Sequence, residues 1–167
     1  MGDRCYLTIR FHRDSGYIPA FREVMEYFSN DTDYLTNLES WLSGCMDDAE
    51  GIPGQCIMEE ANYGLLKERE EWAKQGLRFY GEHGAGGCYG AADFFSDGKE
   101  CVDIPRSEGN IIVACPESGA DATSLLSILD RAPVEEVKYP TLNTLHKALN
   151  NLEAEHRIRK EIDDSWK

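Results

Sequence analysis

Residues 5–12, CYLTIRFH, decide the class of fold to which this chain belongs. Apolar side chains occupy every second position of the segment: Cys5, Leu7, Ile9 and Phe11. That two-residue period is typical of a strand with one buried and one solvated face. Because the apolar face has to be buried, the segment predicts a sheet covered by helices. We expect its other face, with a tyrosine and an arginine, on the side that the helices leave uncovered.

The rest of the chain continues this mixture of strands and helices. Helices are predicted from Pro19 through Phe28 and over residues 33–43, 65–75, 121–131 and 142–165. Strands are predicted over residues 55–62, 77–80, 88–95, 100–104 and 110–115. Asp97-Gly98 predicts a hairpin turn, because glycine supplies the positive φ that tight turns need. The helix over 65–75 carries Leu65, Leu66, Arg69 and Trp72 on one face.

The order of these elements predicts an α+β fold with a mixed or mainly antiparallel sheet. We expect an elaborated ferredoxin-like core with helices mainly on one face. The chain has 167 residues and shows neither a linker nor an internal repeat. It is therefore predicted to form one domain, residues 1–167, that ends in the helix over about 142–165.

The charge of the chain restricts its partners. Asp and Glu number 31 against 17 Lys and Arg, so the formal net charge is −14. A field of that sign repels phosphate backbones and anionic lipids, which argues against direct binding to nucleic acid or membrane and favours a basic partner. No run approaches the roughly 18 apolar residues of a membrane helix, and no signal region is present, so we predict a cytoplasmic protein.

The acidic residues are concentrated in one interval. Between Arg22 and Lys67 the chain has no Lys, Arg or His. Ten acidic residues lie there: Glu23, Glu26, Asp31, Asp33, Glu39, Asp47, Asp48, Glu50, Glu59 and Glu60. Three aromatic residues of the interval are candidate anchors of a contact: Tyr27, Tyr34 and Trp41. The interval predicts a negative surface that could imitate the phosphates of a duplex, although a solvated surface that aids solubility is the simpler interpretation.

The sequence predicts no cofactor and no metal site. Asp47, Asp48 and Glu50 are clustered on a predicted loop, but they lack the alternating spacing with which carboxylates wrap a hard cation. Six cysteines occur without a CxxC pair, and most have apolar neighbours, which is typical of free thiols that pack as small hydrophobes.

A second candidate site lies in the glycine-rich stretch 81–90. His83 and Cys88 could form a thiolate–imidazole pair, with Asp93 or Glu82 orienting the imidazole. A small cysteine-dependent enzyme is therefore an alternative function. The competing interpretation is a buried cysteine beside a surface histidine.

The last predicted helix offers a third interpretation. Leucines recur along it at heptad spacing: Leu142, Leu145, Leu149 and Leu152. Two heptads are too few for a coiled coil, so packing on the sheet is expected. A homodimer through this helix, acting as an accessory or assembly protein, stays open.

Several short fragments resemble a known class of proteins. EANYG at 60–64, Gly76, LRF at 77–79 and Tyr89-Gly90 together look like a pattern of small proteins from phages and other mobile elements. In size and acidity the chain is also similar to anti-CRISPR and antirestriction inhibitors, unrelated folds that often present carboxylates to nucleic-acid-binding surfaces. The resemblance implies a non-enzymatic inhibitor of a host defence complex in the bacterial cytoplasm, and it assigns no residue roles.

Overall fold

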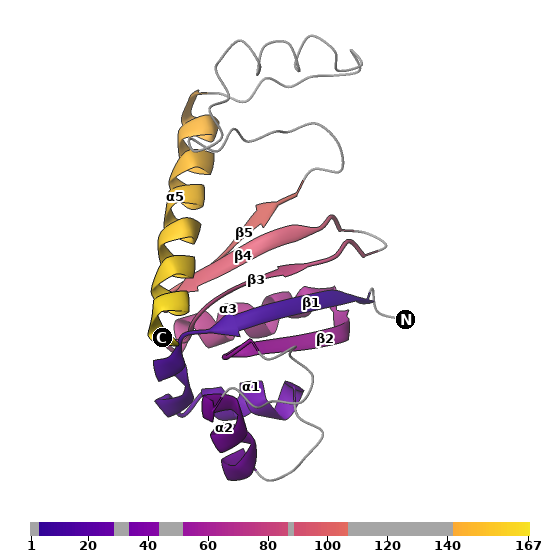
Figure 1. Cartoon of the computed structure of the whole chain (residues 1–167). Helices are drawn as coiled ribbons and strands as arrows, with labels where there is room; N and C mark the ends of the chain where they lie inside the picture. The colour runs from indigo at the N-terminus through magenta and orange to yellow at the C-terminus, as the bar shows by residue number, and fades with distance from the viewer. Residues whose placement is uncertain (1–3, 29–33, 44–51, 87–88, 107–141) are drawn as a thin grey trace.

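The computed structural model describes residues 4–28, 34–43, 52–86, 89–106 and 142–167 (Figure 1). The strands are β1 (Arg4–Phe11), β2 (Gln55–Asn62), β3 (Arg78–His83), β4 (Ala92–Asp97) and β5 (Cys101–Pro105). The α-helices are α1 (Phe21–Phe28), α2 (Tyr34–Ser43), α3 (Leu66–Lys74) and α5 (Leu142–Ser165). Two short 3-10 helices are η1 (Arg13–Tyr17) and η2 (Tyr63–Leu65). The predicted strand over 110–115 and helix over 121–131 lie outside the described residues.

The described strands form one sheet in the order β2-β1-β3-β4-β5, and every neighbouring pair is antiparallel. This arrangement confirms the predicted α+β class with a mainly antiparallel sheet. It differs from the ferredoxin-like core that we expected, because the split βαβ unit of that core brings parallel strands together. Here β1 lies antiparallel to both of its neighbours, with Ile9 opposite Cys56 on β2 and Gly81 on β3.

Helices cover both faces of the sheet. The apolar residues of β1 pack in a main core with α1, α2 and α3, where Phe21, Trp41 and Trp72 are buried. A second core forms on the opposite face, where Ile158 and Ile162 of α5 pack against Phe95. Two-sided coverage follows from the sequence of β4, because Phe94 and Phe95 are adjacent and therefore point to opposite faces.

The second core changes the environment of Arg10. We expected the arginine face of β1 on an uncovered side, but α5 lies over this side. Arg10 Nη1 donates to Asp163 Oδ1 at 2.6 Å, and the Tyr80 hydroxyl donates to the same oxygen at 2.8 Å. The arginine is thus held between the sheet and α5 by a partly buried ion pair.

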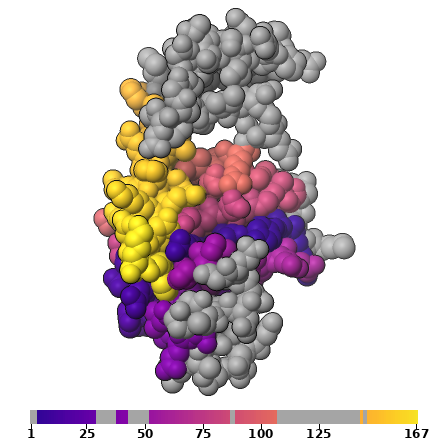
Figure 2. Space-filling model, in the orientation of Figure 1, coloured from indigo at the N-terminus to yellow at the C-terminus, as the bar shows by residue number. Residues whose placement is uncertain are grey.

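Helix α5 has the predicted bounds, and its C-terminal half is the part that packs on the sheet (Figures 1 and 2). The chain end is fixed by Trp166, whose Nε1 donates to the Phe11 carbonyl oxygen at 2.9 Å. Leu149, one of the heptad leucines, is 43% exposed. A homodimer through helix α5 stays a prediction, which a measurement of solution mass would test.

The hairpin between β4 and β5 follows its predicted turn. Gly98 has a φ of 88°, in the left-handed region that glycine tolerates best. Asp97 Oδ1 accepts a hydrogen bond from the Lys99 amide at 2.9 Å, which closes the turn. Strand β4 begins at Ala92 rather than at the predicted residue 88. None of the helices in the described part of the chain is both long and apolar enough to cross a membrane.

The second core predicts a difference between two substitutions on α5. Ile162→Ala removes a fully buried side chain and should lower the free energy of unfolding by about 2–5 kcal/mol. Leu149→Ala on the exposed part of the same helix should change it by less than about 0.5 kcal/mol. Urea unfolding of both variants measures the difference, and equal effects would contradict the packing of α5 on the sheet.

Candidate functional site

Five of the ten predicted acidic site residues are described, and all five are exposed. Glu23 and Glu26 lie on α1, Glu39 lies on α2, and Glu59 and Glu60 lie on β2. Helices α1 and α2 lie beside β2 at one end of the molecule (Figure 1), so these elements share one end of the structure. The other five, Asp31, Asp33, Asp47, Asp48 and Glu50, lie outside the described residues.

We call this part of the structure, with its five exposed glutamates, the acidic end, and arginines neutralise part of its charge. Glu60 forms an ion pair with Arg4 of β1, and Arg22 lies 3.5 Å from Glu26 one turn away on α1. Among the described residues, no Lys or Arg comes within ion-pair distance of Glu23, Glu39 or Glu59. Because β2 is an edge strand of the described sheet, its exposed glutamates also discourage pairing with strands of other chains.

The three predicted aromatic anchors have different environments. Tyr27 is 46% exposed, and its hydroxyl lies 3.4 Å from Glu68 Oε1 on α3, to which it donates. Desolvation and the charge of Glu68 raise the pKa of this tyrosine. Trp41 is only 1% exposed, so its predicted role as a surface anchor is wrong: the indole packs against Phe21 in the core. The side chain of Tyr34 lies outside what the structure describes.

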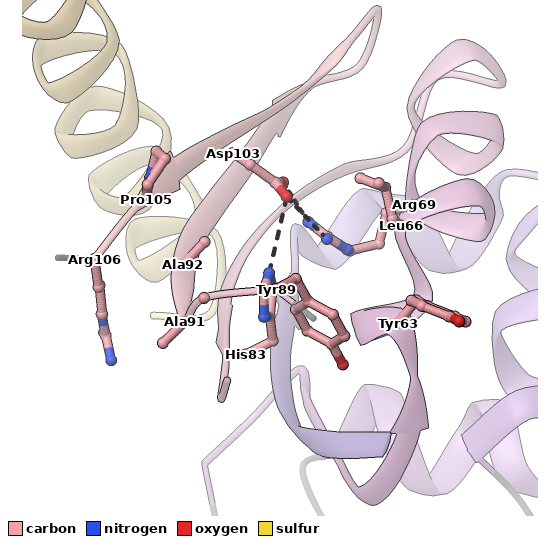
Figure 3. Close-up of a pocket in the computed structure, with 11 residues that line it drawn as sticks. Tyr63, Leu66, Arg69, His83, Tyr89, Ala91, Ala92, Asp103, Pro105 and Arg106 are labelled. Carbon is pink, nitrogen blue, oxygen red and sulfur yellow. Dashed lines mark hydrogen bonds and ion pairs between the residues drawn. The ribbon is translucent and has the colours of Figure 1, made fainter. Parts of the chain in front are cut away.

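A cavity of about 310 Å³ opens between η2, α3 and the part of the sheet formed by β3, β4 and β5 (Figure 3). Aromatic, charged and aliphatic residues together line it: Tyr63, Leu66, Arg69, His83, Tyr89, Asp103, Pro105 and Arg106, with Gly90, Ala91 and Ala92. Residues 90 and 91, which we predicted to belong to a strand, line this cavity, and β4 begins only at Ala92. We refer to it as the Asp103 pocket.

The floor of the Asp103 pocket is an ion pair between a buried arginine and a partly exposed carboxylate. Arg69 is fully buried, and its Nη1 donates to Asp103 Oδ1 at 2.7 Å while its Nε donates to the Gly64 carbonyl oxygen at 2.8 Å. The guanidinium also lies over the Phe94 ring, 3.9 Å from its centroid. Burial raises the pKa of the Asp103 carboxyl, but neighbouring His83 and Arg69 outweigh it, so the net shift is downward. The carboxylate is therefore ionised at neutral pH.

His83 occupies the other side of the carboxylate. It is 5% exposed, and its Nδ1 lies 2.9 Å from the Gly84 carbonyl oxygen. Because a carbonyl only accepts, Nδ1 carries the hydrogen in that bond. Nε2 then faces Asp103 Oδ2 at 3.8 Å. In Figure 3 Asp103 points between Arg69 and His83, and Tyr89 lies beside the imidazole.

One wall of the pocket is a left-handed turn. Tyr63, Gly64 and Leu65 have φ values of 50°, 58° and 53°, although this conformation is unfavourable for residues with a side chain. Glycine is required at position 64 for a second reason, because an added Cβ would lie 3.0 Å from the His83 ring. The turn aims the Gly64 carbonyl at Arg69 and leaves the Tyr63 ring 49% exposed at the pocket rim.

The pocket corrects the alternative site that the sequence suggested. Glu82 and Asp93, the predicted partners of His83, both bind Arg106, and Asp103 is the carboxylate that faces the imidazole. Cys88 lies outside the described residues. Cys101 contacts Arg69, but burial raises the pKa of its thiol to about 12, so it is not a thiolate. In the described ranges, no three His, Cys, Asp or Glu side chains come together as a metal site would need.

Sequence reasoning missed Asp103 and the role of Arg69. One signal was present, since Arg69 falls on the face of its helix that also carries Trp72. A charged residue on a buried face needs a partner of opposite charge. The partner lies 34 residues further along the chain, on β5, and only the pairing of strands brings it to the helix.

Comparison with known proteins does not assign this pocket or the acidic end. A search of protein-family models, of curated proteins and of solved structures finds no match to the chain. The site is therefore interpreted from its own geometry and charge.

The buried pair predicts a large effect of Arg69→Met. This change leaves Asp103 without its main cation and should lower the free energy of unfolding by about 3 kcal/mol, the lower end for buried pairs because the carboxylate keeps some contact with water. Lys67→Met, an exposed change on the same helix, should cost less than about 0.5 kcal/mol. Chemical denaturation compares them, and a stable Arg69→Met variant would contradict the role of the pair.

Asp103 also predicts how stability depends on pH. Its pKa is lowered in the folded protein from an ordinary value of 3.8. Its contribution is therefore present above that value and is lost as the pH falls through the lower folded-state pKa. We expect the stability difference between the parent and Asp103→Asn to be large at about pH 6 and to shrink toward about pH 2. A difference that does not change with pH would contradict this assignment.

Proposed function

We propose that the protein is a non-enzymatic inhibitor that binds the basic nucleic-acid-binding surface of a host defence complex. The observation that carries the proposal is the group of Glu23, Glu39 and Glu59, exposed at one end of the molecule with no cation partner among the described residues. Phage-encoded proteins of the anti-CRISPR or antirestriction kind are the class that fits such a surface. The site of action would be the bacterial cytoplasm.

The mechanism is electrostatic competition. Carboxylates at the acidic end engage Lys and Arg side chains that otherwise hold phosphates, so DNA is excluded from the same surface. The net charge of −14 accelerates the encounter at low salt. The half-exposed Tyr27 ring beside these carboxylates supplies apolar contact area, which slows dissociation.

Two features narrow the proposal. Glu26 and Glu60 already have arginine partners and would have to give them up, so they contribute less than Glu23, Glu39 and Glu59, which have no cation partner in the described part of the chain. Trp41 takes no part because it is buried. The rival explanation is that the glutamates of β2 only protect an edge strand and aid solubility. Charge-reversal variants distinguish the two explanations. Solubility depends on the total charge of the protein, whereas a binding contact depends on where on the surface the charges lie.

The first experiment asks whether the position of the negative charges matters or only their total, in cells that carry a defined CRISPR or restriction system. The parent protein should raise phage plating efficiency, and Glu23→Lys, Glu39→Lys and Glu59→Lys together should abolish that effect. The matched control reverses three exposed glutamates on other elements: Glu70, Glu100 and Glu153. The control should keep activity. Equal loss in both triple variants, or activity in neither the parent nor the control against any system, would contradict the proposal.

Asp47, Asp48 and Glu50 provide a second test. Their joint reversal to lysine should also abolish binding without unfolding the protein, because they belong to the same cation-free interval of the sequence. Circular dichroism checks the fold of the variant. A variant that inhibits as well as the parent would show that these three carboxylates are not part of the contact.

The salt dependence of binding gives an independent readout on the purified complex. Capture of the partner should weaken steeply as the salt concentration rises, because screening acts on the charges that bring the surfaces together. Added duplex DNA should compete with the protein for the partner. Binding that survives high salt and is indifferent to DNA would indicate a different surface.

A further inference from the structure

We propose that the contact with the partner continues from the acidic end onto the turn formed by η2 and α3, and that the Asp103 pocket receives one aromatic side chain of the partner. This inference rests on the proposed function, because it assigns a second part of the contact surface to the same basic protein. Three features carry it: exposed apolar residues on the turn, the hollows beside them, and the pairing of the charges that line the pocket.

Exposed apolar side chains gather on and beside this turn. Tyr63 and Leu66 are both exposed where η2 leads into α3. Tyr27 of α1 is exposed as well and reaches the same helix, because its hydroxyl donates to Glu68 at 3.4 Å. Exposed apolar residues with charged residues around them are typical of surfaces that bind other proteins.

Tyr63 and Leu66 are shared by two hollows of the surface. Both residues line the Asp103 pocket. Both also line a second hollow, together with three further residues: Asn62, Lys67 and Glu68. Asn62 is the last residue of β2, and Glu68 contacts Tyr27 of α1, so this hollow adjoins two elements of the acidic end. A polypeptide bound at the acidic end can therefore follow the surface over Tyr63 and Leu66 to the pocket.

The charged groups of the pocket are already paired, which favours an uncharged side chain as its occupant. Both carboxylate oxygens of Asp103 accept from Arg69, at 2.7 and 3.3 Å. Arg106 binds two other carboxylates, those of Glu82 and Asp93. A charged side chain that enters the pocket would compete with these pairs, whereas an aromatic side chain leaves them intact.

Aromatic and aliphatic groups form another part of the lining. The Tyr63 and Tyr89 rings lie 5.8 Å apart between centroids, and Leu66, Ala92 and Pro105 also line the pocket. Aromatic rings pair favourably with a further ring that lies edge-on or offset. The cavity volume, about 310 Å³, is at the lower end for ligand pockets, so it suits one aromatic side chain better than a larger ligand.

The left-handed turn is a separate reason to assign a contact here. Tyr63 and Leu65 adopt positive φ without being glycine, and such backbone conformations are concentrated at functional sites. In Figure 3 the Tyr63 side chain projects away from His83, so the strained backbone presents this ring to solvent. A partner can contact the ring there.

The acidic end determines the charge of the partner segment. Glu23, Glu39 and Glu59 attract Lys and Arg side chains. The segment that fits both parts of the surface therefore combines basic residues with an aromatic residue. Its charges accelerate the encounter, and burial of its ring in the pocket slows dissociation.

The test is a titration of the full-length, isotope-labelled protein with three peptides that share one glycine–serine linker. The linker joins a lysine block to tryptophan, the same block to alanine, or a glutamate block to tryptophan. The lysine–tryptophan peptide should shift the amide signals of Gly64 and Ala92 at the pocket, and of Glu59 at the acidic end, in a saturable way. The lysine–alanine peptide should bind at least about fivefold more weakly, and the glutamate peptide should not bind.

Three outcomes of this titration would overturn the proposal. The first is equal affinity of the two lysine peptides. The second is a lysine–tryptophan peptide that leaves the Gly64 and Ala92 signals unshifted. The third is a glutamate–tryptophan peptide that binds as tightly as its lysine counterpart.

Matched tyrosine variants test whether the Tyr63 ring makes the contact. Tyr63→Asn removes the ring, and asparagine tolerates the left-handed backbone, so the peptide affinity should fall about fivefold or more in a folded protein. Leu66→Gln, at the start of α3, should have the same effect. Tyr17→Asn changes an exposed tyrosine of η1 that lines neither hollow and should leave the affinity unchanged. Equal affinity of all three variants would contradict the assignment.

The same variants separate this inference from the proposed function. In the phage plating assay, Tyr63→Asn should reduce the inhibition of the defence system, and Tyr17→Asn should keep it. Equal inhibition by the parent and Tyr63→Asn would overturn the pocket contact and leave the role of the acidic end in place. A parent without activity would contradict the proposed function, and the peptide titration would then decide on the pocket alone.

Discussion

The buried guanidinium of Arg69 constrains the part of the structure that is formed by η2, α3, β4 and β5. A charge removed from water must find compensating partners, and this one takes a carboxylate from β5, a carbonyl from η2 and the face of an aromatic ring on β4. These contacts tie three segments of the chain to helix α3. They also explain why η2 can hold a left-handed backbone, because the Gly64 carbonyl has a fixed donor there.

The same constraint produces the Asp103 pocket. Asp103 accepts hydrogen bonds from Arg69 with both carboxylate oxygens, and the Oδ2 atom also faces His83 Nε2 at 3.8 Å. The Asp103 carboxylate remains partly exposed, and it lines the same pocket as the Tyr63 and Tyr89 rings. The acidic end is built differently. Its glutamates project from α1, α2 and the edge strand β2 and depend on no buried partner.

The two halves of the molecule therefore present different chemistry. Charge at the acidic end acts over a distance and is sensitive to salt, as capture of a basic surface requires. The Asp103 pocket instead holds its charged groups in ion pairs and is lined by aromatic rings. Helix α5 packs on the face of the sheet opposite the main core. Its Asp163 binds Arg10, and Trp166 donates to the Phe11 carbonyl, so both contacts hold β1 in place.

The sequence by itself determined the class of fold and most of the elements. Alternation marked β1, β2 has its predicted bounds, and α5 begins and ends where its apolar spacing indicated, because these signals are local. The sequence also indicated the acidic end, because an interval with acidic residues and no basic residue carries negative charge however it folds. Only the tertiary structure decided strand order, the burial of Trp41, and the choice of Asp103 over Glu82 and Asp93 as the neighbour of His83. Each of these depends on contacts between residues far apart in the chain, which no local period records.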